Sequence, residues 1–211
     1  MACCSLACAN SSGRVRQIVG PFGVEVQFYI VSGGLGPIIR ACPTVARHVT
    51  WVYASELDTD DRGILRGVKR AVTFTEKTRY LFEIHKGIHG SRTERNPLLV
   101  NAYVDPRRRP VPFAHMIYVG DGETDIPCFS LLEANGGFAF GVIDKSRETA
   151  ARRKVLQLLA PRPARVRSVH APNYQPGTSL YEALALSISS IGGRIEALRE
   201  AAYASRPVRS P

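Results

Sequence analysis

Two carboxylates stand close together in the segment Tyr118–Pro127, which reads Y-V-G-D-G-E-T-D-I-P. Asp121 comes directly after a short apolar run typical of a buried strand, and Asp125 follows four residues later, after a turn that Gly122 permits. Both side chains can therefore face one point beyond the end of the strand. Hard oxygen ligands that converge in this way suit Mg²⁺, which keeps several waters and shares a substrate phosphate. The pattern also fits a structural interpretation, in which Asp125 caps the helix that follows.

Two further segments carry groups that bind anions. The run V-S-G-G-L places the Ser32 hydroxyl and the backbone N–H groups around Gly33 at the end of an apolar strand, directly before a helix. Such N–H groups and a helix N-terminus favour a phosphate, although a serine before two glycines is also an ordinary turn and N-cap. Lys86, in the run F-E-I-H-K-G-I, is a cation that follows a short helix, where a lone lysine is usually solvated.

Apolar patterning and turn residues predict that strands and helices alternate along the chain. Strands are expected over residues 24–31, 48–54, 115–119, 138–143 and 166–170. Helices are expected over residues 35–46, 76–85, 127–135, 147–159 and 179–203. The segment from Ser55 to Thr75 contains turn signals followed by alternating residues, which indicates a small antiparallel hairpin projecting from the sheet.

This alternation predicts an α/β fold with a Rossmann-like parallel sheet that is covered by helices on both faces. In such sheets ligands lie beyond the carboxyl ends of the strands, and Ser32 and Asp121 both fall there. A length of 211 residues suits one domain. We expect a polar lead-in over residues 1–13, a folded core over 14–203 and a frayed tail over 204–211.

In their order along the chain, these three segments resemble the motifs of the haloacid dehalogenase-like hydrolase superfamily, a group dominated by Mg²⁺-dependent phosphatases. The matching runs are Y-I-V-S-G-G-L, I-H-K-G and V-G-D-G-E-T-D-I-P, and the similarity extends from about Val24 to Ile195. The extension P-C-F-S-L-L after the last motif looks like one bacterial branch of the superfamily. The expected fold is thus the core of these hydrolases.

The resemblance implies a role for each motif residue. Ser32 and Gly33 would bind a phosphoryl oxygen, while Lys86 would bind the phosphoryl group, neutralise its developing charge and hold the nucleophile. Asp121 would ligate Mg²⁺, directly or through water, with Asp125 supporting it. These roles suit phosphoryl transfer, which depends on positioning and charge neutralisation more than on elaborate bond chemistry.

The first motif of the superfamily is missing. It is an apolar strand ending in D-x-D, in which the first Asp is the nucleophile and the second is the general acid and base. None of the 31 residues before Ser32 is Asp, and the D-x-D of this chain, Asp58 to Asp60, follows Ser32 and falls in the expected hairpin. The missing strand would lie between the other two motif strands. We expect those strands to close together, or Arg14–Val19 to fill the gap, or the fold to be marginal.

Other nucleophiles find little support in the sequence. Cys42 and Arg47 form C-x4-R, one residue short of the C-x5-R phosphate loop, and Cys128 has no arginine at that spacing. The G-x-S-x-G run of a Ser-His-Asp hydrolase is absent. Four histidines show no metal-ligand spacing and are expected at the surface or hydrogen-bonded in the core: His85, His89, His115 and His170.

The charge and the cysteines of the chain limit which partners and which cellular compartment are expected. The net charge is +10, but only 5 of the 28 basic residues are Lys. A GC-rich coding sequence produces such an excess of arginine without selection for a ligand. Nucleic acid is therefore not expected as a partner. The five cysteines form neither a readable disulfide framework nor a zinc pattern. No window approaches the roughly 18 apolar residues of a membrane span. A cytoplasmic protein that does not contact membranes is expected.

The expected activity of the intact superfamily is Mg²⁺-dependent hydrolysis of a small phosphorylated substrate. The resemblance also implies a cap, the part of these hydrolases that largely sets their specificity, and the sequence contains none. Because the nucleophile motif and the cap are missing, we expect this chain to be truncated, to bind Mg²⁺ weakly, and to be weakly active or inactive. The alternative is a non-enzymatic protein that keeps the phosphate site and binds a phosphorylated ligand or a partner.

Overall fold

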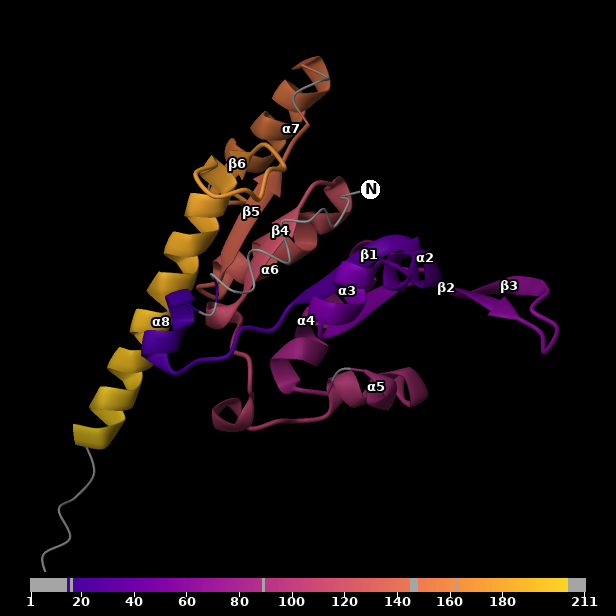
Figure 1. Cartoon of the computed structure of the whole chain (residues 1–211), viewed down its shortest axis with the longest axis horizontal. Coiled ribbons are helices and arrows are strands. Elements are labelled where there is room, and N and C mark those ends of the chain that lie inside the picture. Colours follow the sequence, from indigo (N-terminus) through magenta and orange to yellow (C-terminus); the bar gives the residue numbers. More distant parts are fainter. Residues whose placement is uncertain (1–14, 16, 89, 145–147, 162, 205–211) are drawn as a thin grey trace, which may run out of the picture.

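Strands and helices alternate in the computed structural model of the chain, which describes residues 15, 17–88, 90–144, 148–161 and 163–204. The strands of these residues form two three-stranded sheets, in the orders β1-β2-β3 and β4-β5-β6 (Figure 1). The predicted α/β, Rossmann-like fold class is confirmed, with its sheet in two parts. The expected lead-in over residues 1–13 lies outside the described residues, as does the expected tail except Ala204, which ends a helix.

The first sheet consists of β1 (Tyr29–Leu35), β2 (Trp51–Thr59) and β3 (Leu65–Arg70). β1 pairs with β2 in parallel, with Tyr29 opposite Trp51. β1 therefore begins five residues later than predicted, because β2 starts only at Trp51 and gives Val24 no partner. β1 also continues through Ser32, with a register shift in the pairing between Val31 and Leu35.

β2 extends beyond the residues that pair with β1, and the chain then returns as β3 in an antiparallel hairpin. The Asp60 carboxylate fixes the turn, since it accepts hydrogen bonds from the backbone N–H groups of Arg62 (3.1 Å) and Ile64 (2.8 Å). The hairpin projects away from the other elements in Figure 1. The predicted projecting hairpin is confirmed.

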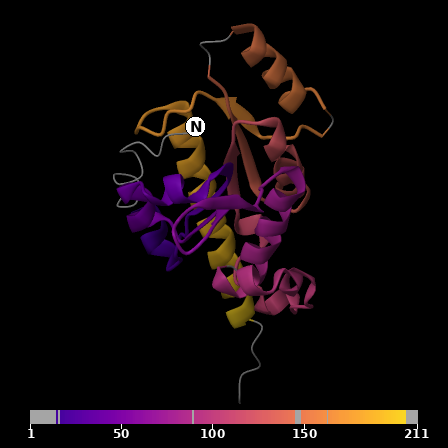
Figure 2. The same ribbon diagram turned by 90° about the vertical axis from the view of Figure 1, so that its right-hand side faces the viewer.

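The second sheet consists of β4 (Ile117–Gly120), β5 (Phe138–Val142) and β6 (Ser168–His170), all parallel. Gly120 lies opposite Gly141, and Val142 lies opposite His170, so the strands end at one carboxyl edge. Along β5, Phe140 faces the long helix α8 (Ser179–Ala204), while Ala139 faces α7 (Glu148–Leu159). α8 runs along this sheet in both views (Figure 1, Figure 2).

The helix predicted over residues 35–46 is broken in two. α2 (Gly36–Arg40) and α3 (Pro43–His48) are separated at Cys42, which is extended with φ −72° and ψ 120°. The cause is Pro43, whose ring disfavours a helical conformation of the preceding residue and which has no N–H to donate. Both helices still cover one face of the first sheet, where Val45 packs with Val52.

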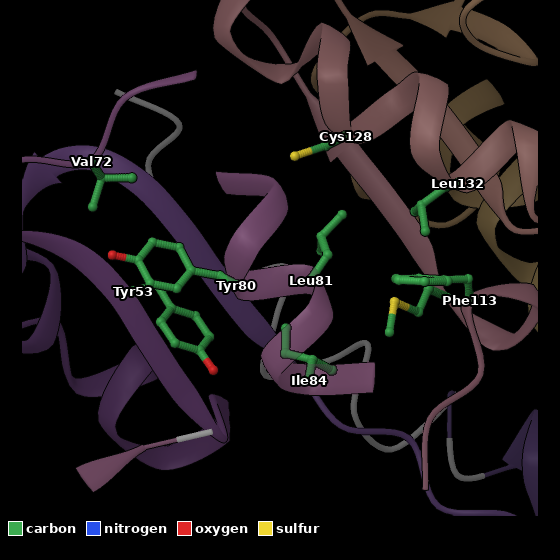
Figure 3. Packing of buried hydrophobic residues seen from close by; sticks show 9 residues of the cluster. Tyr53, Val72, Tyr80, Leu81, Ile84, Phe113, Cys128 and Leu132 are labelled. Carbon is green, nitrogen blue, oxygen red and sulfur yellow. The ribbon is translucent and has the colours of Figure 1, made fainter. Parts of the chain in front are cut away.

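α4 (Phe74–Lys86) packs against both sheets and joins them. On one side Tyr80 of α4 stacks on Tyr53 of β2, with ring centroids 4.2 Å apart. On the other side Leu81 and Ile84 meet residues of α6 (Ile126–Ala134), and each is 4% exposed; burial of such a side chain contributes about 2 kcal/mol. Figure 3 shows this cluster: Tyr53, Val72, Tyr80, Leu81, Ile84, Phe113, Met116, Cys128 and Leu132.

The remaining elements are short. α5 (Ser91–Arg95) follows α4, and the 3-10 helices are Gly20–Phe22, Pro97–Asn101, Pro106–Arg108, Phe113–His115 and Glu123–Asp125. Among the helices of the described residues, none combines the length and the apolar character needed to cross a bilayer.

The sheet is interrupted between β1 and β4. Within the described residues each of these strands is paired along one edge, β1 with β2 and β4 with β5, and they do not pair with each other. The expectation that they close together is wrong. The second expectation was that Arg14–Val19 fill the gap; in the described part of that segment, Val15 and residues 17–19 are helical and add no strand to either sheet. The interruption separates the strand that contains Ser32 from the strand that precedes Asp121.

Gly192 of α8 lies against the N-terminal segment and provides a test of this packing. A Cβ at Gly192 would lie 2.3 Å from the Phe22 ring, whereas a Cβ at Gly193 would meet nothing within 4 Å. We expect Gly192→Ala to lower the free energy of unfolding by about 1–3 kcal/mol because Phe22 must move. Gly193→Ala should raise it by about 0.5–1 kcal/mol through helix propensity. Urea unfolding measures both, and equal effects would contradict the contact.

Candidate functional site

The Asp125 carboxylate is buried at the carboxyl end of β4, with 3% of the residue exposed. Its Oδ1 accepts a hydrogen bond from the Tyr118 hydroxyl at 2.7 Å, and its Oδ2 accepts one from the backbone N–H of Gly122 at 3.0 Å. A Cβ at Gly120 would lie 2.7 Å from Cγ of Asp125, so only glycine allows this approach. Asp125 therefore fixes the loop that carries Asp121.

Lys77 supplies the cation that balances Asp125. Its Nζ lies 2.7 Å from Oδ1 of Asp125 and 2.9 Å from Oγ1 of Thr124, and 7% of the residue is exposed. An ammonium group has three N–H donors, and no described residue accepts from the third. The first turns of α4 and the β4 loop are thus joined by a buried ion pair that keeps one donor free.

Burial keeps two neighbours of this ion pair protonated. Desolvation, followed by the proximity of Cys128 and Asp125, raises the pKa of the Tyr118 hydroxyl, so Tyr118 remains a neutral donor to Asp125. Burial likewise raises the pKa of the Cys128 thiol to about 12. The thiol therefore stays protonated near neutral pH, where the thiolate is the reactive form.

Asp121 is exposed at the edge of the site. Its backbone carbonyl accepts a hydrogen bond from Lys154 of α7, while its carboxylate bonds to none of the described residues. Asp121, Glu123 and Lys154 line one small depression. Of the two predicted carboxylates, Asp121 is therefore the one available to a ligand.

The Ser32 loop is tied to the same end of α4. The Ser32 hydroxyl oxygen accepts from the backbone N–H of Gly34 at 3.0 Å, which leaves its own O–H free to donate. The Gly33 carbonyl accepts from the Ser55 hydroxyl at 3.0 Å, and Oγ of Ser55 accepts from the N–H of Val72 at 3.1 Å. Val72 directly precedes the N-cap of α4. The start of α4 therefore contacts both predicted loops.

Lys86 does not reach this site. Its Nζ donates to the carbonyl oxygens of Val100 at 2.6 Å and Ala102 at 2.8 Å, at the opposite end of α4. Lys86 follows Lys77 by nine residues, which is about 14 Å along a helix axis. The predicted lysine, Lys86, is therefore bonded away from Asp121 and Asp125, and the lysine that contacts Asp125 is Lys77.

The sequence contained a signal for Lys77. Lys77, Leu81 and Ile84 recur at the spacing of one helix face, and all three are buried. A lysine in the apolar stripe of an amphipathic helix needs a buried anion. The sequence-based prediction missed it because the I-H-K-G run pointed to Lys86.

Asp58 and Asp60 lie in the projecting hairpin, and Asp60 is occupied by the turn and by Arg66 at 3.0 Å. Asp60 therefore has a structural role in the turn, and Asp58 lies in β2 opposite Gly67. His85 is buried and hydrogen-bonded through both ring nitrogens, as expected of a core histidine. His89 lies outside the described residues.

The oxygen donors at this edge fit Mg²⁺ poorly. Both Asp125 oxygens already accept hydrogen bonds from the protein, which is compatible with the supporting role that the resemblance implies for Asp125. Asp121 then supplies one available carboxylate, and within the described ranges no three His, Cys, Asp or Glu side chains converge on a metal position. One exposed carboxylate is too few ligands to retain Mg²⁺ without further donors.

Comparison with known proteins does not indicate an activity for this chain. No protein-family model matches the chain. It is 33% identical over 122 residues to a protein of Borreliella burgdorferi, whose name, "Uncharacterized protein", specifies no function. The match covers 51% of this chain and 40% of the relative, so the chain corresponds to less than two thirds of that protein.

Lys77 and Lys86 form a matched pair for testing the ion pair. Lys77→Met leaves the Asp125 carboxylate buried without its cation, and we expect a loss of about 3 kcal/mol in the free energy of unfolding. Lys86→Met makes the same change on the same helix but removes only bonds to two carbonyls, and should lose about 1 kcal/mol. Urea unfolding of the two variants measures the difference, and equal losses would refute the assignment.

A thermal shift in Mg²⁺ tests the metal site. At about 1 mM MgCl₂ we expect the Tm to rise by less than about 2 °C, because one carboxylate binds the ion weakly. Asp121→Asn should show the same small shift. A rise of many degrees that Asp121→Asn abolishes would mean that the site has more ligands than Asp121.

Proposed function

We propose that the carboxyl edge between β1 and β4 binds the phosphoryl group of a small molecule, and that the chain is the core of a haloacid dehalogenase-like phosphohydrolase. The observation that carries the proposal is Lys77. Its buried ammonium lies in the first turns of α4, bonded to Asp125 and Thr124 of the loop that carries Asp121, and keeps one N–H donor for a ligand. A buried cation with a free donor is suited to a phosphoryl oxygen.

Each group at this edge has a distinct task in the proposal. Ser32 donates its free O–H to one phosphoryl oxygen. Lys77 donates to another and offsets the negative charge, while Asp125 and Thr124 hold its position. The N-terminus of α4, which has no side-chain cap, adds a favourable dipole for an anion. Asp121 faces the solvent beside these groups, where a hydrated cation carried by the phosphate would meet it.

Catalysis needs a nucleophile that the described carboxylates do not provide. Asp125 is occupied by three donors, and Asp58 and Asp60 belong to the hairpin. We propose that a further strand, placed between β1 and β4, brings the attacking carboxylate, and that this chain alone is weakly active or inactive. Mg²⁺ would bind weakly without the ligands of that strand.

The proposed ligand is a small phosphorylated molecule rather than a nucleic acid or a membrane. The proposed compartment is the cytoplasm, in keeping with the free thiols of Cys42 and Cys128. A second function is binding of a phosphorylated ligand without turnover. It is favoured by the observation that the buried Asp125 carboxylate accepts three hydrogen bonds from Lys77, Tyr118 and Gly122, which suits a structural role better than nucleophilic attack.

Titration with inorganic phosphate, followed by ³¹P NMR, tests the binding part of the proposal. We expect a dissociation constant on the order of 1 mM, weakened roughly fivefold in Ser32→Ala through one lost hydrogen bond and further in Lys77→Met. Lys86→Met is the control and should bind like the original chain. Lys77→Arg keeps the charge if Lys77→Met fails to fold, and should retain most binding. Absence of saturable binding at about 20 mM would contradict the proposal.

Turnover of p-nitrophenyl phosphate tests the claim that the attacking carboxylate is missing. With and without Mg²⁺ we expect a rate close to the uncatalysed background, because no attacking carboxylate is in place. Robust Mg²⁺-dependent turnover that Asp121→Asn abolishes would contradict the claim that the nucleophile is missing. Loss in Asp58→Asn as well would identify Asp58 as the nucleophile that the hairpin assignment rejects.

A further inference from the structure

A groove opens at the far end of α4 from Lys77. It has a volume of about 420 Å³ and is lined by Phe82 and His85 of α4, together with Arg109, Phe113, Leu131 and Asn135. Phe113 precedes β4 and Asn135 follows α6, so the groove lies at the amino-terminal edge of the second sheet, away from Asp121. His85 follows Lys77 by eight residues, about 12 Å along the helix. The groove is separate from the proposed phosphoryl site.

The walls of the groove are aromatic and fixed. The His85 ring stacks on Phe113, with centroids 4.1 Å apart and an interplanar angle of 13°. Phe82 meets Phe113 edge to face at 5.1 Å, and 37% of Phe82 remains exposed although it is a large apolar side chain. Aromatic walls of this kind bind flat apolar groups.

Arg109 places one fixed cation in the groove. Its Nε donates to the Val104 carbonyl at 2.9 Å, and its Nη1 lies 3.1 Å from Nε2 of His85. Nδ1 of His85 lies 2.8 Å from the Val111 carbonyl, which can only accept, so Nδ1 carries the proton and Nε2 accepts from Arg109. His85 is therefore neutral, in agreement with burial lowering its pKa. Arg109 Nη2 donates to no described residue.

The charge of the lining defines the ligand. Arg109 is the charged residue among those that line the groove, and none of them is acidic. The volume falls in the range of small-molecule sites, roughly 300–1,000 Å³. A planar guanidinium with a free edge matches the planar oxygens of a carboxylate.

We propose that this groove binds a small aromatic carboxylate, with the ring against Phe82 and Phe113 and the carboxylate on Arg109. Asn135 at the rim offers a further polar contact. The site does not depend on the phosphoryl site or on the missing nucleophile, because no residue is shared between them.

Binding of 4-fluorobenzoate, followed by ¹⁹F NMR on the full chain, tests the proposal, with 4-fluorobenzamide as a neutral ligand of the same shape. We expect 4-fluorobenzoate to bind at least about tenfold more tightly than the amide, in line with a charge-assisted hydrogen bond. Arg109→Gln should remove this preference. Arg108→Gln is the matched control, since Arg108 is exposed and lies outside the groove, and should change binding less than about twofold.

Phe82→Ala provides a second variant on an exposed position, should Arg109→Gln fail to fold. It should weaken both ligands by a similar factor and leave their ratio unchanged, because it removes part of the apolar wall. Equal binding of the carboxylate and the amide would overturn the proposal, as would equal losses in Arg109→Gln and Arg108→Gln. Absence of saturable binding at about 10 mM 4-fluorobenzoate would also overturn it.

Discussion

The buried ion pair between Lys77 and Asp125 is the constraint on which the site depends. It joins residues 48 positions apart, from the first turns of α4 and from the loop after β4. Burying two charges is costly, and the pair repays this only with good geometry and additional hydrogen bonds. Tyr118, Gly122 and Thr124 supply those bonds. Removal of either charge would leave the other buried and unpaired.

The apolar cluster and the ion pair fix different properties of the molecule. Tyr80, Leu81 and Ile84 hold α4 against both sheets by burial of apolar surface, which favours contact but does not select one exact rotation or register of the helix. The ion pair adds a directional constraint, because Nζ of Lys77 must reach both Oδ1 of Asp125 and Oγ1 of Thr124. The interrupted sheet can therefore keep the Ser32 and Asp121 loops at one end of α4 without a ladder between β1 and β4.

Local patterns in the sequence predicted most of the elements and failed where tertiary contacts decide. The strand before Asp121 and the hairpin after Ser55 were predicted because their turn residues and apolar alternation are local. One unbroken helix was predicted over residues 35–46 because apolar residues recur there at helical spacing, but Pro43 divides the segment into two helices. The two-part sheet could not be predicted with certainty, since it depends on which strand lies beside β1. At the site, the positions of Asp121 and Ser32 relative to their strands were predicted from local patterns, whereas the burial of Lys77 beside Asp125 depends on which face of α4 meets Asp125.

A double-mutant cycle between Lys77 and Asp125, measured by urea unfolding, tests the central claim most directly. Lys77→Met, Asp125→Asn and the double variant each remove one or both charges of the pair. The account predicts that the double variant loses less free energy of unfolding than the two single variants together. The difference, which is the coupling free energy, should be about 1.5–3 kcal/mol. Losses that add to within about 0.5 kcal/mol would contradict the claim that this ion pair fixes α4 over the β4 loop.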